Sequence, residues 1–123
     1  ELKARYRAAI EERRWPIAML AKTETLQDAP ATYAAKVGRQ SRGRNAAYEL
    51  ALRSGRDYRA GDQISYYVTG TRKNVPVHEY AKRVSDWNPQ HRDENVAYYV
   101  AKLEKLYEKF CRGQWGAEDA AEH

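Results

Sequence analysis

The sequence predicts a mainly helical α+β domain that carries a small β element and a long C-terminal helix. The clearest observation is an apolar stripe at helical spacing in residues 96–110. A shorter stripe of the same kind occupies residues 1–14. A period-2 pattern in residues 62–69 indicates one strand. We therefore expect helices around a short antiparallel hairpin or sheet.

Residues 62–69 alternate between apolar and polar side chains, which is typical of a half-buried strand. The inward-facing set is Ile64, Tyr66 and Val68. Glycines bound this strand, with Gly61 before it and Gly70 after it. Two cations, Arg72 and Lys73, follow on the turn. Such a turn could present cations to phosphate, and the alternative is an ordinary solvated turn.

The sequence of the N-terminal third predicts several short helices and turns. The helix in residues 1–14 should end before Pro16, because the residue preceding a proline avoids helical angles. The apolar run 17–20 fits either a helical turn or a strand. A turn anchored by Tyr33 should lead into a short helix over residues 31–37.

Positive charge is in excess in the stretch between residues 28 and 49. No acid lies between Asp28 and Glu49. The cations of this stretch are Lys36, Arg39, Arg42 and Arg44. Ser41 or Asn45 can cap the next helix, which Gly55 should end. Arginines beside a helix N-terminus form an anion site, and the alternative is a solvated loop whose arginines pair with carboxylates.

The C-terminal half is less regular until its last helix. Residues 75–77 should be extended at a sheet edge, because Pro76 cannot donate a backbone hydrogen bond. Residues 78–92 have little periodicity and predict irregular structure. Asp93 and Glu94 suit the first turn of the final helix, where acids complement the helix dipole.

Gly113 should end that helix. We therefore predict one domain over residues 1–112 and a mobile acidic tail over residues 113–123. The chain opens without Met, inside a charged helical pattern, so we expect a fragment of a longer protein.

Composition limits the possible functions. The formal net charge of +5 favours a polyanionic partner. The single cysteine, Cys111, excludes an internal disulfide framework and fits a reducing compartment. No apolar run approaches the roughly 20 residues that span a bilayer, so we expect no membrane partner.

No self-contained active site is evident. The sequence lacks a glycine-rich phosphate loop, a zinc-ligand spacing and a His-Glu-x-x-His pattern. Cys111 with His78 or His91 is an unconvincing nucleophile–base pair, because a lone thiol late in an amphipathic helix is usually inert. Asp57 and Asp62 flank a turn, where Asp is a common residue. We therefore expect no catalytic or metal-binding residues.

Four motifs, taken together, resemble the C-terminal thumb domain of family B DNA polymerases. Residues 59–70 resemble its "pG-x-x-I-x-Y-v-v" segment. Residues 89–110 resemble the "p-x-k-h-x-y-D-x-x-Y-Y" stretch that leads into the long helix of the thumb. Residues 19–23 and 31–55 stand where the family has an apolar-Lys segment and a tyrosine followed by a helix. The resemblance covers residues 15–112 in the family's order.

The resemblance implies a fragment of a DNA-directed DNA polymerase of the archaeal or bacterial polymerase II type. A thumb grips primer–template duplex through phosphates and the minor groove without reading sequence. Catalysis and Mg²⁺ would belong to the palm of the parent chain, and this fragment would need no cofactor. The resemblance also implies a monomer in the cytoplasm of a prokaryote, near the nucleoid. It implies a sliding clamp as a partner of the parent chain, in replication or repair.

The residues that the resemblance and the charge pattern assign to DNA share a polar or cationic side chain beside a turn, strand or helix start. They are Lys22, Thr23, Arg39, Arg42, Arg44, Asn45, Thr71, Arg72, Lys73, His91 and Arg92. Each is expected to contact phosphate. The alternative function is a non-enzymatic helical module that binds proteins through its tyrosines.

Overall fold

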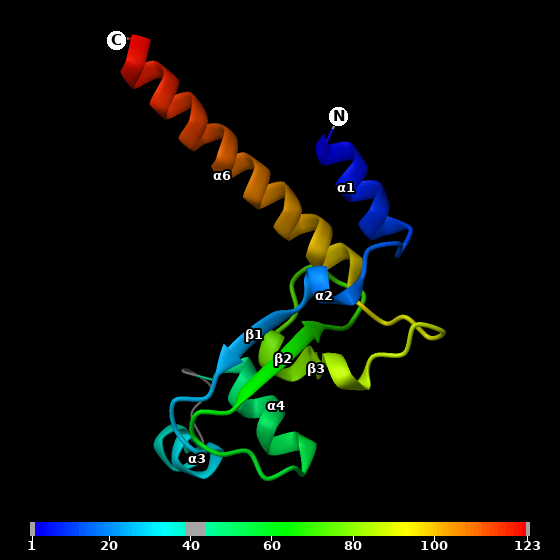
Figure 1. The fold of residues 1–123 in the computed structure, drawn as a ribbon. Coiled ribbons are helices and arrows are strands. Elements are labelled where there is room, and N and C mark those ends of the chain that lie inside the picture. Colours follow the sequence, from blue (N-terminus) through cyan, green and yellow to red (C-terminus); the bar gives the residue numbers. More distant parts are fainter. Residues whose placement is uncertain (1, 39–43, 123) are drawn as a thin grey trace.

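The computed structural model describes residues 2–38 and 44–122, with the side chains of this range up to residue 111. It confirms the predicted α+β class with a small antiparallel sheet and a long C-terminal helix (Figure 1). The described elements are α1 (Leu2–Glu11), α2 (Ile17–Leu20), β1 (Lys22–Thr25), α3 (Pro30–Val37), α4 (Ala46–Ser54), β2 (Gln63–Val68), α5 (Val77–Tyr80), β3 (Ala81–Arg83), the 3-10 turn η1 (Val84–Asp86) and α6 (Val96–Glu122).

The predicted strand is β2, the centre of a three-stranded sheet with the order β1-β2-β3. Both neighbours are antiparallel, with Lys22 of β1 and Arg83 of β3 on either side of Tyr66. Tyr66 is buried, as predicted for a core residue. The half-buried pattern is wrong, however, because Tyr67 on the opposite face is also fully buried. Its phenol donates a 2.6 Å hydrogen bond to Asp93, which satisfies the one polar atom that would otherwise oppose burial.

Two apolar clusters flank the sheet, and β2 contributes to both. One combines Ile64 and Tyr66 with Leu26 and the inner face of α4. The other combines Tyr67 and Val68 with apolar side chains of α1, α2 and α6. Figure 1 shows the consequence: α3 and α4 lie at one end of the sheet, and α6 projects from the other end with α1 beside it.

The predicted ends of α4 are confirmed. Asn45 precedes the helix in an extended conformation, and its side-chain oxygen accepts a 3.2 Å bond from the amide of Tyr48. Gly55 follows the helix with φ 72°, the left-handed conformation that glycine favours. The tyrosine predicted as an anchor, Tyr33, is buried and stacks on Tyr48 with ring centroids 4.6 Å apart.

Two predictions for the connecting segments are wrong. Residues 75–77 do not form a sheet edge, because Pro76 occupies the N-cap position of α5. The third strand is formed instead by residues 81–83, which lie within residues 78–92, where we expected irregular structure. This short strand shows no apolar alternation because its cations are paired: Lys82 binds Asp93 and Arg83 binds Asp86.

Both predicted boundaries of the last helix are also wrong. α6 begins at Val96, so Asp93 and Glu94 precede its first turn. At the other end the backbone stays helical through Gly113 to Glu122. A helical glycine costs only about 1 kcal/mol relative to alanine, and no proline follows to stop the helix.

Residues 93–95 attach the start of α6 to the sheet. The Asp93 carboxylate accepts hydrogen bonds from Tyr67 of β2, at 2.6 Å, and from Lys82 of β3, at 2.9 Å. Glu94 is buried and forms ion pairs with Arg13 and Arg92. The contacts of Asp93 therefore favour its ionised carboxylate in the folded state.

The pKa of Asp93 predicts how stability responds to acid. Burial raises this pKa, but the hydrogen bonds from Tyr67 and Lys82 outweigh burial, so the pKa is lower than its ordinary value. A carboxyl group with a lowered folded pKa stabilises the protein above its unfolded pKa of about 4 and loses that contribution as pH falls through the folded pKa. We predict that the free energy of unfolding falls as pH drops below about 4 and that Asp93→Asn flattens this part of the profile.

Urea denaturation over roughly pH 2 to 6 measures the effect. Asp86→Asn is the matched control, because Asp86 pairs with Arg83 in an exposed position. A full acid-dependent loss of stability in Asp93→Asn would assign that loss to other carboxylates.

Candidate nucleic-acid interface

The loop after β2 is fixed by a buried amide. The side-chain nitrogen of Asn95 donates to the carbonyl of Thr69 at 3.0 Å and to the carbonyl of Arg72 at 2.8 Å. Asn95 is 0% exposed, and its side-chain oxygen accepts from the amide of Tyr98 in the first turn of α6. One side chain therefore caps the long helix and sets the conformation of the basic loop.

Gly70 makes this close approach possible. Its φ of 106° lies in the region that only glycine adopts easily. A Cβ atom at this position would lie 2.9 Å from the Tyr80 ring and 3.2 Å from the Asn95 amide nitrogen. The glycine that ends β2 thus lets the loop turn sharply against Tyr80 and Asn95.

The loop presents three of the predicted contact residues to solvent. Thr71, Arg72 and Lys73 are all exposed. Lys73 lies beside α6, where it lines one hollow together with Lys102 and Lys105 and with the acids Glu104 and Glu108. The basic loop and the long helix therefore form one continuous surface.

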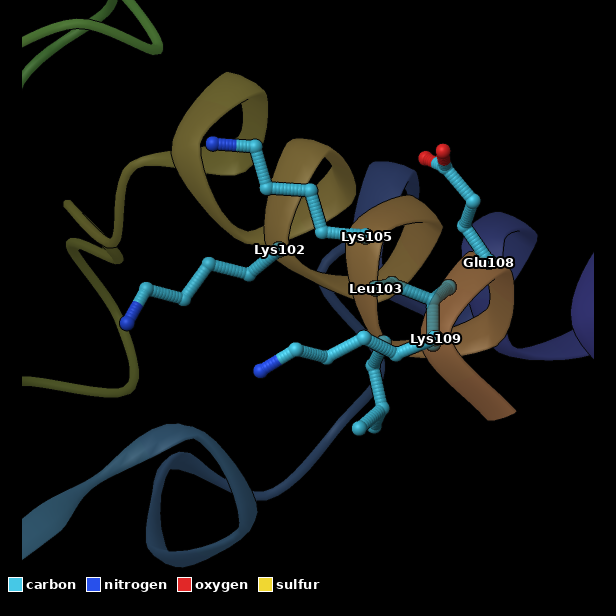
Figure 2. A pocket seen from close by; sticks show the side chains of 6 residues that line it. Lys102, Leu103, Lys105, Glu108 and Lys109 are labelled. Carbon is cyan, nitrogen blue, oxygen red and sulfur yellow. The ribbon is translucent and has the colours of Figure 1, made fainter. Parts of the chain in front are cut away.

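Sequence reasoning missed the helix side of this surface. Lys102, Lys105 and Lys109 are spaced i, i+3 and i+7, which places them along one side of α6. Figure 2 shows Lys102 and Lys109 extending in the same direction, whereas the side chains of Lys105 and Glu108 turn to another side of the helix. The spacing was visible in the sequence, but the apolar stripe of the same helix dominated its interpretation. We call Lys73, Lys102, Lys105 and Lys109 the lysine face.

The lysine face is electrostatically available. Among the side chains that the structure describes, none forms a salt bridge with a lysine of this face. The Lys102 ammonium lies 5.1 Å from the centre of the Tyr98 ring, a cation–π contact that leaves the charge intact.

Lys22 and Thr23 lie on the edge strand β1. The Lys22 ammonium pairs with Glu24 at 3.0 Å, and this bond is the main reason that the pKa of Lys22 is raised. The Thr23 hydroxyl hydrogen-bonds to Ser65 across the sheet at 2.6 Å. Glu24 therefore offsets much of the charge of Lys22, and no described contact joins Lys22 to the lysine face.

The predicted anion site before α4 is occupied by internal contacts. The Arg44 guanidinium binds the Glu49 carboxylate at 3.2 Å and the carbonyl of Gly38 at 3.2 Å. Asn45 caps the helix and donates its own amide to the Tyr33 hydroxyl. Two further predicted residues, Arg39 and Arg42, lie outside the described residues.

The last two predicted residues differ in their surroundings. Arg92 stacks on Trp87, pairs with Glu94 at 2.7 Å and donates to the carbonyls of Arg13 and Trp15. The Arg92 guanidinium is therefore engaged by groups of the fold itself and does not belong to the interface. His91 is exposed in the loop before α6, and no described contact joins its side chain to the lysine face.

No family model and no curated protein matches this chain. Within residues 2–38 and 44–111, no group of three or more His, Cys, Asp or Glu side chains could hold a metal ion. No helix in the described part of the chain is long and apolar enough to cross a membrane.

Alanine at position 70 tests the geometry of the loop. Gly70→Ala combines an unfavourable φ with the Tyr80 clash, whereas Gly61→Ala at φ 91° meets open space. We predict that Gly70→Ala lowers the free energy of unfolding by about 1–3 kcal/mol more than Gly61→Ala does. Urea denaturation of the two variants measures the difference. Equal losses would mean that the loop is not packed against Tyr80 and Asn95.

Proposed function

We propose that this chain is a non-catalytic module that grips double-stranded DNA through its phosphates, as the thumb of a family B DNA polymerase does. The observation that carries this proposal is the convergence of a fixed basic loop and three helical lysines. Lys73 stands on a loop held by a buried amide, and Lys102, Lys105 and Lys109 stand on the adjacent helix.

The spacing of the lysine face suits a regular polyanion. Residues 102 and 109 are seven positions apart, which is about 10 Å along an α-helix. One DNA strand carries about three phosphates over that axial length. Lysine is a point charge on a flexible stem, so it can follow the backbone of any sequence. This chemistry supports sequence-independent gripping rather than base readout.

Thr71 and Arg72 on the same loop extend this surface. In the parent chain, the palm would supply catalysis and its Mg²⁺ ions, and this module would hold primer–template duplex behind the palm. A nucleotidyltransferase activity, a sliding-clamp partner and a place near the prokaryotic nucleoid belong to that proposed parent.

Charge removal at two positions tests the interface. We predict that Lys73→Ala with Lys105→Ala weakens binding to a mixed-sequence duplex and reduces the slope of log K against log salt by about 1.8, which is about 0.9 for each lost phosphate contact. Fluorescence anisotropy over a series of salt concentrations measures the slope.

The matched control is Arg56→Ala with Arg59→Ala, which removes the same charge from two exposed positions between α4 and β2. It should leave the slope unchanged. Equal effects of both pairs would show that net charge alone attracts DNA. An unchanged slope in the lysine pair would refute the interface.

A further inference from the structure

A second surface lies between α1 and α6 and is apolar. Leu2 is 53% exposed, Leu106 is 63% exposed and Phe110 is 64% exposed. These three side chains line one hollow with Tyr6 and Tyr107. We call these five residues the α1–α6 groove. Large apolar side chains gathered in one exposed hollow are typical of an interaction site.

Two helices line the groove, each with one apolar row. Leu2 and Tyr6 are four residues apart on α1, and Leu106 and Phe110 are four residues apart on α6, so each helix contributes one apolar row. α1 packs directly against α6, which places the two rows beside each other (Figure 1). A third helix can lay its apolar face across two such rows.

Positive charge borders the groove on its Leu106 side. Leu106 also lines a hollow with the lysine row Lys102, Lys105 and Lys109. On the other side, Lys3 of α1 shares a hollow with Tyr107, and the acids Glu104 and Glu108 line that hollow too. The nearby acid Glu104 is neutralised by Arg7 at 2.8 Å.

We propose that the α1–α6 groove binds an amphipathic helix of another protein that has an apolar row and an acidic flank. Acidic side chains beside the apolar row would pair with the lysines that border Leu106. A second copy of this chain fits less well, because symmetric docking would bring two lysine rows together. A flat anionic bilayer fits less well, because the apolar side chains line a hollow between two helices.

Two designed peptides test the chemistry of the partner. One is an 18-residue helical peptide with Leu and Phe at i, i+4, i+7 and i+11 and Glu on the flanks, and its twin carries Lys in place of Glu. The acidic peptide should bind the chain at least about tenfold more tightly than its twin. Leu106→Ala with Phe110→Ala should weaken that binding about tenfold or more. Lys73→Ala should leave it unchanged, because Lys73 does not line the groove.

Three results would overturn the proposal. These are equal binding of the two peptides, unchanged binding in the double variant, and a groove occupied by something else. Sedimentation would reveal the last case as a dimer that the double variant abolishes, and flotation with phosphatidylserine vesicles would reveal a lipid surface. Leu106 and Phe110 are exposed, so an unchanged thermal melt should show that the variant still folds. Duplex binding should persist in this variant, so failure here is distinct from failure of the DNA interface.

Discussion

The rest of the structure depends on the three side chains at 93–95. Asp93 bonds to the sheet through Tyr67 and Lys82. Glu94, 1% exposed, joins the turn after α1 to the loop before α6 through Arg13. Asn95 caps α6 and holds the basic loop. These three consecutive side chains thus connect the sheet, the N-terminal segment and the basic loop to the start of α6. The position of α6 and the conformation of the loop therefore cannot vary independently.

The ion pairs around Glu94 explain why some cations of the chain are not available to a ligand. A buried carboxylate is costly unless cations and hydrogen bonds compensate it, and Glu94 receives both arginines, Arg13 and Arg92. Arg44 serves Glu49 in the same way. Among the described residues, no buried acid pairs with Lys102, Lys105 or Lys109 of α6. Arg13, Arg44 and Arg92 are therefore engaged by acids of the fold. Within the described part of the chain the lysines of α6 are not, and their compact charge and flexible stem suit loose contact with phosphates.

Local chemistry made part of this fold predictable. The cap at Asn45, the stop at Gly55 and the core position of Tyr66 depend on short-range rules, and all three are confirmed. The burial of Tyr67 depends on Asp93, 26 residues away, and the role of Arg92 depends on Glu94 and on carbonyls 77 and 79 residues away. Periodicity contains no information about such partners. The lysine spacing on α6 was readable, but its link to Lys73 required the loop geometry that Asn95 imposes.

α6 carries two surfaces that share one border. The lysine row at 102, 105 and 109 belongs to the proposed DNA interface on one side, and it flanks Leu106 in the α1–α6 groove on the other. An acidic helix in the groove would neutralise charges that phosphates also need, without covering the loop at Lys73. Two ligands that use the same cations oppose each other's binding, and thermodynamic linkage makes that opposition equal in both directions. If both proposals hold, the helix that grips DNA is also the place where a protein partner would loosen that grip.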